Sequence, residues 1–310
     1  MSEVRVAVVG VGGIAQRIHL PTLVTMPGVR LSAIVDIDRA RLDQIGDRYG
    51  VARRPTSIAE LVAQGGADCA VVTTQPEHHP EVAIALLEAG IDVFCEKPLA
   101  LTLADCRRMV ETAERHGRIL MAGFNRRFMP SFQKAKAAFE GRPLDVLAIE
   151  KNKSENEHRT LVRDGIHMVD TMRWLCGEPT EVVAWAKWSE NQEREETVLA
   201  QIRFDSGTFG SLVIHRAGGT WIEKAELYGG GCTAIVDAPE RVRIMCDGKE
   251  ESIGLGPWST LADRFGFTAE LNHFVECVRD QRQPINAGPD ALKTHQLVDE
   301  IYRRAGLPGM

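Results

Sequence analysis

The chain has 310 residues, of which 44% are apolar and 26% are charged, and its formal net charge is −6 at pH 7. The length is enough for about two domains, and the composition is that of a globular chain rather than a disordered one. The charge gives no general attraction for nucleic acid or anionic membranes, and no apolar stretch reaches the ~18 residues that span a bilayer. Strand-like sequence begins at Val4, which leaves no room for a signal peptide, so we expect a cytoplasmic protein.

The first expected strand, Val4–Val9, runs directly into a GxGxxA sequence, and a helical segment toward Met26 follows. In a dinucleotide-binding loop the first glycine permits a tight turn, the second lets the backbone approach a pyrophosphate, and the small last residue allows close helix packing. Amides at the start of the helix then face the phosphates. The predicted cofactor contacts in this loop are Gly10, Gly12, Gly13, Ile14 and Ala15.

A second expected strand, 31–35, ends in Asp36, about 20 residues beyond the glycine motif. A carboxylate there can accept hydrogen bonds from the adenosine ribose and would repel the 2′-phosphate of NADP, which favours NAD. Alternatively, Asp36 or Asp38 caps the next helix; we assign Asp36 to the cofactor and Asp38 to the cap. Arg39 and Arg41 keep NADP open, because a nearby arginine can accommodate the extra phosphate.

Strand and helix then continue to alternate. The further expected elements are a short helix opened by a capping box at 57–60, a strand at 69–73, a helix from Pro80 to Gly90, a strand at 93–95, a helix from Thr102 to Gly117 and, as the sixth strand, 118–122. Such alternation implies a Rossmann-type, doubly wound parallel sheet, here as domain 1–123. Ligands of such sheets lie beyond the carboxyl ends of the strands, where the loop after the strand at 69–73 offers the candidate cofactor contacts Thr73, Thr74, Gln75 and His79.

The strand at 93–95 ends in Glu96-Lys97-Pro98. Proline cannot continue the ladder and holds the preceding residue extended, so the strand stops at the ligand crevice and Lys97 faces what binds there. Lys97 is therefore the first candidate for chemistry, and a solvated cation paired with Glu96 is the alternative.

A sequence from Gly123 to Pro130 forms the predicted hinge into a different second domain, 124–310. Hairpin signals such as Asp205-Ser206-Gly207 and Asp247-Gly248 indicate an α+β domain with a large open, mostly antiparallel sheet. The expected strands are 145–151, 181–188, 197–204, 208–215, 221–228, 232–237 and 241–246, and the expected helices are 131–140, 165–175, 268–279 and 289–305. The polar stretch 152–163 is expected to be a solvated loop, although its basic residues, with Arg126 and Arg127, could favour an acidic substrate.

Helix 165–175 carries the second catalytic candidate, His167. Asp164, His167, Asp170 and Thr171 follow spacings of three and four residues and share one side of the helix. An imidazole flanked by carboxylates is suited to act as a general base near neutral pH. Alternatively, Asp164 is the helix N-cap and His167 is an ordinary partner of Asp170.

The seven cysteines are odd in number, widely spaced and without a CxxC pair. We expect buried reduced thiols rather than disulfides or a zinc site, and we predict no metal. A Ser/His/Asp hydrolase is not indicated either, because the sequence has no GxSxG elbow.

These motifs together resemble the Gfo/Idh/MocA oxidoreductases, the family of glucose–fructose oxidoreductase and inositol dehydrogenase, over nearly the whole chain. The resemblance rests on the glycine motif, Asp36, Glu96-Lys97-Pro98, Asn125-Arg126-Arg127-Phe128, Gly165-Ile166-His167-x-x-Asp170, and the sequences from Glu226 to Gly229 and up to Asp237. Residues 149–152 with 167–171 look more like the MviM-like branch.

The resemblance implies a Rossmann domain that binds NAD, with NADP as the alternative, and a second domain whose open sheet forms homodimers or homotetramers. It implies that Lys97 polarises a secondary alcohol or ketone of a sugar, cyclitol or polyol, that His167 exchanges its proton, and that Glu96, Asn125 and Arg127 join Lys97 in binding the cofactor. The Lys97-Pro98 peptide is expected to be cis.

One position departs from the family pattern. Relatives carry an Asp four residues before the motif histidine, but here that residue is Arg163, and Asp164 follows it. A shift of one residue turns a helical side chain by about 100°, so Asp164 either compensates as the third catalytic residue or leaves the site altered. The competing functions are a non-catalytic nucleotide-binding sensor or regulator of the same fold, and methyl transfer from S-adenosylmethionine.

Overall fold

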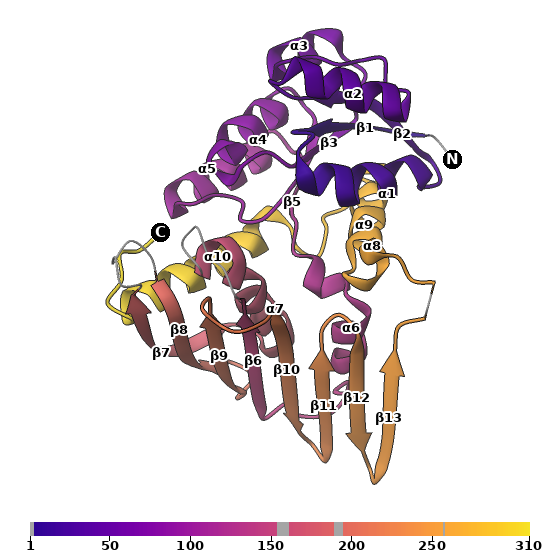
Figure 1. Ribbon diagram of the computed structural model, residues 1–310. Helices are drawn as coiled ribbons and strands as arrows, with labels where there is room; N and C mark the ends of the chain where they lie inside the picture. Colours follow the sequence, from indigo (N-terminus) through magenta and orange to yellow (C-terminus); the bar gives the residue numbers. More distant parts are fainter. Residues whose placement is uncertain (1–2, 154–160, 189–194, 257) are drawn as a thin grey trace. The chain divides into compact units, whose positions relative to one another are not determined.

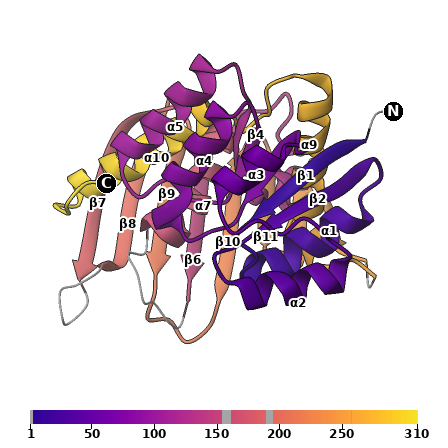
Figure 2. The same cartoon turned by 90° about the horizontal axis from the view of Figure 1, so that it is seen from above.

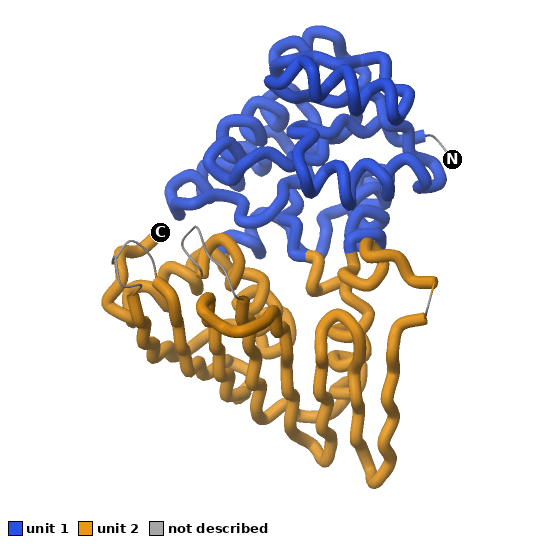
Figure 3. The backbone as a smooth tube through the Cα atoms, in the orientation of Figure 1, with its two compact units in different colours: residues 1–124, 267–292 blue, residues 125–266, 293–310 orange. Residues whose placement is uncertain are grey.

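The structure is a computed structural model that describes residues 3–153, 161–188, 195–256 and 258–310. Its contacts divide the chain into two compact units, residues 1–124 with 267–292 and residues 125–266 with 293–310 (Figure 3). This division differs from the expected boundary, because Phe267–Leu292 belongs with the first unit. The reason is local packing: the Phe267 ring lies 6.0 Å from that of His19, and Ala122 N donates to Asn286 O at 3.1 Å.

The first unit contains a five-stranded parallel sheet of order β2-β1-β3-β4-β5. Its strands are β1 (Val4–Val9), β2 (Val29–Val35), β3 (Cys69–Val72), β4 (Asp92–Cys95) and β5 (Leu120–Ala122). Its helices and helical turns are η1 (Ala15–His19), α1 (Leu20–Thr25), α2 (Arg39–Tyr49), α3 (Ile58–Gln64), η2 (Pro76–His78), α4 (His79–Glu88), α5 (Leu103–Arg115) and α9 (Phe267–Asp280). Every residue of β3 and β4 is buried, as expected of strands covered on both faces; in Figure 1, α2 and α3 lie on one side of this sheet and α1 and α9 on the other.

The doubly wound parallel sheet is confirmed, and in the described residues it has five strands, so the expected strand at 118–122 is the fifth rather than the sixth. The segment 51–55 runs beside β2, where Ile34 N donates to Arg53 O at 3.1 Å, without extending into a ladder. Pro55, which has no N–H to donate, follows two residues later.

The expected helix caps are present. Asp38, Ser57 and Thr102 each accept a hydrogen bond from the backbone N–H three residues on. In a full capping box the Glu60 carboxylate would accept a hydrogen bond from the backbone N–H of Ser57. Here it accepts instead from the backbone N–H of Thr56 at 2.8 Å.

The second unit contains an eight-stranded sheet of order β13-β12-β11-β10-β6-β9-β8-β7, in which β6 and β9 are parallel and all other neighbours antiparallel. Its strands are β6 (Val146–Asn152), β7 (Pro179–Trp188), β8 (Glu195–Phe204), β9 (Phe209–His215), β10 (Ile222–Gly229), β11 (Cys232–Asp237), β12 (Arg241–Cys246) and β13 (Lys249–Gly254). Its helices and helical turns are η3 (Asn125–Phe128), α6 (Pro130–Ala137), η4 (Leu161–Gly165), α7 (Ile166–Cys176) and α8 (Leu261–Arg264), while α10 (Gly288–Arg304) runs from the first unit into the second.

This sheet buries one face and exposes the other. Burial alternates residue by residue along β6, β9 and β10, and α6 and α7 cover the buried face through contacts with β11, β12, β6 and β9 (Figure 1). Figure 2 shows the neighbouring strands β7, β8, β9 and β6 of this sheet side by side. The mostly antiparallel sheet is therefore confirmed. Strand β13 and helix α8 were not expected; β13 completes the hairpin signalled by Asp247 and Gly248, whose φ angles of 54° and 75° suit a tight two-residue turn.

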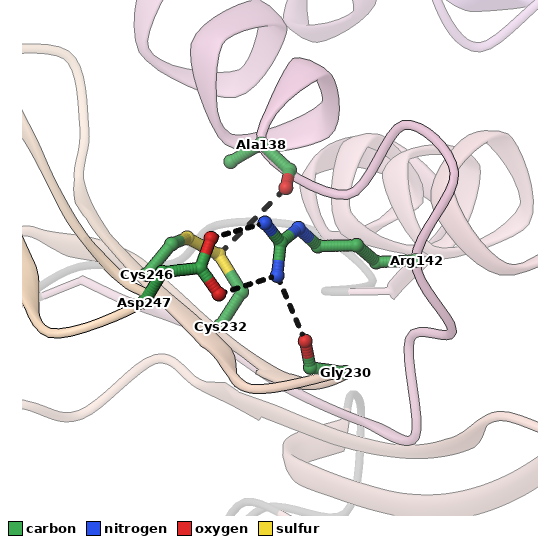
Figure 4. Close-up of a disulfide and its surroundings, with 6 residues drawn as sticks. All are labelled: Ala138, Arg142, Gly230, Cys232, Cys246 and Asp247. Atoms are coloured by element: carbon green, nitrogen blue, oxygen red, sulfur yellow. Dashed lines mark hydrogen bonds and ion pairs between the residues drawn. A yellow bond between two sulfur atoms is a disulfide. The ribbon is translucent and has the colours of Figure 1, made fainter.

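Two cysteines correct the expectation of reduced thiols. Cys232 on β11 and Cys246 on β12 are direct partners in the register and form a disulfide, beside the Arg142–Asp247 ion pair of 2.5 Å (Figure 4). The pairing of β11 with β12 brings these two cysteines together. The five others, Cys69, Cys95, Cys106, Cys176 and Cys277, are free and buried, as expected. Among the described helices, none is long and apolar enough to cross a membrane.

Candidate active site

The glycine loop is held by the end of β3. Gly10 has a φ of 86°, and a Cβ atom there would stand 2.8 Å from Thr74 N, so both its backbone conformation and its packing require glycine. Thr73 Oγ1 donates to the carbonyls of Val9 and Gly10. A Cβ at Gly12, by contrast, would meet nothing within 4 Å. The space around Gly12 is therefore open, and the dinucleotide-binding motif requires the backbone at this position to approach a pyrophosphate closely.

Asp36 closes the same loop from β2. One carboxylate oxygen accepts from Val11 N at 2.9 Å, the other accepts from Asp38 N at 3.0 Å, and Arg41 Nη1 lies 3.2 Å away. Arg41, rather than Arg39, is therefore the arginine at this carboxylate. Arg39 forms an exposed ion pair with Asp43 at 3.2 Å.

A cavity of about 480 Å³ lies at the carboxyl ends of β1, β2 and β3. Of the residues expected to bind the cofactor, it is lined by Gly10, Gly12, Asp36, Thr73, Thr74 and Gln75. Arg41, Ile37 and His78 line it as well and were not expected to. Ile37 is 92% exposed, which leaves an apolar surface at this cavity for a flat base. The open glycine loop, the Asp36 carboxylate and the apolar wall fit a dinucleotide.

His79 does not line this cavity but joins two loops at its edge. Its ring nitrogens lie 2.8 Å from Pro98 O and 3.0 Å from Thr74 O. Burial lowers the pKa of His79, so that it acts as a neutral brace between the β3 loop and the loop that carries Lys97.

Lys97 follows β4 and is half-buried, and its peptide bond to Pro98 is cis, as expected. Its own N–H donates to Glu96 Oε2 at 3.2 Å, and Glu96 Oε1 lies 2.8 Å from His19 Nε2. Burial alone would raise the pKa of Glu96, but His19 and Lys97 outweigh it and hold that pKa below its usual range. Glu96 is therefore a buried anion rather than a surface partner of Lys97.

In the second unit, His167 lies on α7 and is 4% exposed. Its Nε2 is 3.4 Å from Arg126 Nη1. A guanidinium is always charged and only donates, so this nitrogen faces Arg126 as an acceptor, which requires a neutral imidazole. Asn125 Oδ1 accepts from Arg126 at 2.9 Å, and Glu223 accepts two further hydrogen bonds from it at 2.6 and 2.8 Å.

Glu223 is the buried anion of this second cluster. Burial opposes its charge, but Arg126 and Lys151 outweigh burial and lower its pKa to about 2. Lys151, 3% exposed, lies 3.4 Å from Glu223, and burial lowers its pKa.

Asp164 is not the helix N-cap, because α7 begins at Ile166 after the π-helical turn η4. Its carboxylate instead forms ion pairs with Lys151 at 3.0 Å, Lys153 at 2.8 Å and Arg216. Asp170, the alternative partner expected for His167, accepts hydrogen bonds from Arg127 Nη2 at 2.6 Å and from Thr294 Oγ1 at 2.9 Å. Asn125 and Arg127, expected at the cofactor, are thus engaged within the second unit, where Asn125 Nδ2 also donates to Phe265 O at 2.9 Å.

Sequence reasoning missed His19 and Glu223, and it treated Arg126 only as loop charge. His19 follows the glycine motif within an apolar run, and a polar residue in such a run is the available signal. Glu223 lies on the buried face of β10, where a charged residue among alternating apolar ones signals a buried partner.

Comparisons with known proteins agree with this architecture. The family described as "Oxidoreductase family, NAD-binding Rossmann fold" (GFO_IDH_MocA) matches residues 4–124, and "GFO/IDH/MocA C-terminal domain" matches 138–234. Myo-inositol 2-dehydrogenase of Thermotoga maritima is 29% identical over 92% of this chain and 91% of its own. D-apiose dehydrogenase of Paraburkholderia graminis is 29% identical over 94% of this chain and 85% of its own.

Among solved structures, the dehydrogenase MviM of Clostridium difficile superposes with a TM-score of 0.89 at 25% identity, covering 97% of this chain and 99% of that one. The matches extend through both halves of the chain, and the five-stranded parallel sheet of the first unit agrees with the Rossmann fold that the family description names. The chain therefore belongs to the Gfo/Idh/MocA family of NAD-binding oxidoreductases.

Proposed function

We propose that this protein is an NAD-dependent dehydrogenase that transfers a hydride between nicotinamide C4 and a secondary alcohol or ketone carbon of a sugar, cyclitol or related polyol. The observation that carries the proposal is Lys97, half-buried at the carboxyl end of β4 in an NAD-binding unit and backed by the buried anion Glu96. The relatives named for myo-inositol and D-apiose support the substrate class.

Bound NAD would supply the hydride acceptor, and the chain's own residues would handle charge and protons. In the oxidation direction Lys97 holds the substrate oxygen by hydrogen bonding and stabilises the negative charge that develops on it. His167, neutral against Arg126, accepts the hydroxyl proton. Asp36 holds the ribose and excludes a 2′-phosphate, so NAD is preferred over NADP.

Absorbance of reduced nicotinamide tests the proposal, with NAD or NADP and a panel of cyclitols, aldoses and sugar acids. Wild type should turn over at least one compound, and Lys97→Met should keep cofactor affinity but lose turnover by ~10³-fold or more. Lys134→Met, at an exposed helical lysine, is the matched control and should behave as wild type. Equal turnover by wild type and Lys97→Met would refute the role of Lys97.

A second candidate is a nucleotide-binding sensor without turnover. Its support is the replacement of the family's Asp by Arg163 and the engagement of Asp164 by three cations. NADH binding by calorimetry, with no turnover of any panel compound, would favour this candidate. Restoring the family residue by Arg163→Asp should then produce activity if the sensor has lost catalysis at this position.

We infer also that the open sheet pairs two copies into a homodimer, or four into a homotetramer. Trp185 on β7 and Leu199 on β8 are direct partners on the exposed face, at 56% and 40% exposure, and Val183 lies beside them at 43%. An apolar cluster of this kind is typical of an interface. Light scattering should show an assembly that Trp185→Arg dissociates; a wild-type monomer at high concentration would contradict it.

A further inference from the structure

The first unit contains a buried pair, His19 and Glu96, next to Lys97. His19 is 0% exposed, and its Nε2 lies 2.8 Å from Glu96 Oε1. The histidine ring is fixed between aromatic edges, 5.7 Å from Phe94 and 6.0 Å from Phe267. Gly123 packs on the other partner so closely that a Cβ there would lie 3.2 Å from Glu96 Cα. The same Cβ would lie 3.3 Å from Glu96 Oε2, so both side chains of the pair are packed against neighbouring groups.

The hydrogen-bond roles of His19 and Glu96 follow from the partners of each atom. His19 Nδ1 is buried and has no hydrogen-bond partner in the described residues. A buried N–H without an acceptor costs about 1–3 kcal/mol, whereas an unused lone pair costs less. Nε2 is therefore the nitrogen that donates, and Glu96, whose pKa is held below its usual range, is the acceptor and the anion of the pair.

That negative charge acts on Lys97. Glu96 Oε2 accepts a hydrogen bond from the backbone N–H of Lys97 at 3.2 Å. The Glu96 carboxylate and the Lys97 ammonium group also interact electrostatically. Among the described residues, His79 also interacts electrostatically with Glu96 and Lys97, and burial lowers its pKa; Cys95, next to Glu96, is a buried thiol whose pKa burial raises. Glu96 is thus the anion that faces Lys97, and it is fixed through His19 rather than by solvent.

We propose that His19 and Glu96 are positioning residues that hold Lys97 in place and keep its side chain charged. The proposal rests on the role of Lys97 stated under the proposed function. It narrows that role: Lys97 serves as a charged hydrogen-bond donor to the substrate oxygen, and the proton moves to another group.

Competitive acetylation with acetic anhydride tests this without substrate or cofactor. Only the neutral amine reacts, so the labelling rate of Lys97, followed by mass spectrometry against pH, reports its charge. Removing an adjacent negative charge should lower the pKa of Lys97 by about one unit. At neutral pH this raises the fraction of neutral amine, and with it the acetylation rate of Lys97, about tenfold. Lys97 of the Glu96→Gln variant should therefore be acetylated about tenfold faster than Lys97 of the wild type.

Two further variants serve as controls. Glu88→Gln removes an exposed carboxylate of the same unit and should label as wild type. His19→Gln keeps a donor toward Glu96 and should also match wild type, whereas His19→Leu should accelerate labelling several-fold. A purely structural role would instead make Gln and Leu equally harmful.

NADH affinity, measured by fluorescence, verifies that each variant is folded. If Glu96→Gln does not bind NADH, the His19→Gln and His19→Leu pair decides the question. Wild-type labelling rates in Glu96→Gln, or in His19→Leu where Glu96→Gln fails to fold, would overturn the inference. Lys97→Met would still test the proposed function separately, because its readout is turnover.

Discussion

The two units place their candidate catalytic groups beside charges of opposite sign. Lys97 in the first unit has the buried anion Glu96 behind it, whereas His167 in the second has the cation Arg126 at 3.4 Å. An anion favours the charged lysine, and a cation favours the neutral imidazole. The contrast teaches that the surroundings of two titratable groups can set their roles by favouring different protonation states. Here the surroundings favour Lys97 as a charged hydrogen-bond donor and His167 as a neutral proton acceptor.

The largest expected effect concerns the anion that supports Arg126. Glu223→Ala leaves Arg126 and Lys151 buried without their shared carboxylate, and breaking such a cluster costs about 3–5 kcal/mol. Urea unfolding of the variant should show this loss, while Glu240→Ala, at an exposed ion pair, should cost less than ~1 kcal/mol.

The same cluster gives a pH dependence of defined sign. The pKa of Glu223 is lowered from 4.5 to about 2, so its contribution to stability is complete above pH 4.5 and is lost as the pH falls toward 2. Glu223→Gln should therefore flatten the acid limb of the stability curve in that window. An unchanged acid limb would show that Glu223 is not the group responsible.

The glycine loop of the first unit offers a matched pair of smaller effects. Gly10→Ala should destabilise the protein by about 1–3 kcal/mol, because the φ of 86° and the contact with Thr74 N both resist a Cβ. Gly12→Ala has open space and should keep its melting temperature but lose NAD affinity at least tenfold. Thermal melting and calorimetry separate the two; equal melting temperatures for both variants would contradict the geometry.

A still smaller effect separates the two arginines near Asp36. Arg39→Ala should change neither stability by more than ~0.5 kcal/mol nor the preference for NAD over NADP, because its ion pair is exposed. Arg41→Ala removes the cation at Asp36 and should weaken NADP binding further relative to NAD. Loss of NADP binding in Arg39→Ala alone would reverse this assignment.

The sequence predicted those features that local patterns determine. The glycine motif, the caps at Asp38, Ser57 and Thr102, and the strand before Lys97 all depend on neighbours a few residues away, and they were predictable. The two sheets were predictable as well, because short apolar runs alternate with helices in the first unit and burial alternates along strands such as β6 and β9 in the second.

Features made by distant residues were not predictable. The Cys232–Cys246 disulfide depends on the register of two strands. Arg126 donates hydrogen bonds to Glu223, which lies 97 residues later in the sequence. The alternative that Asp164 caps the helix is wrong, because the π-helical turn η4 precedes α7, and nothing in the local sequence signals this wider turn.

The opposite charges behind Lys97 and His167 can be tested directly by the pH dependence of kcat for alcohol oxidation. Glu96→Gln should move the alkaline limb of the profile to lower pH, because Lys97 loses its proton more readily. Arg126→Met should move the acid limb to higher pH by about one unit, because His167 keeps its proton longer, while Arg126→Lys should leave it in place. Variants that shift the same limb, or neither limb, would contradict the account.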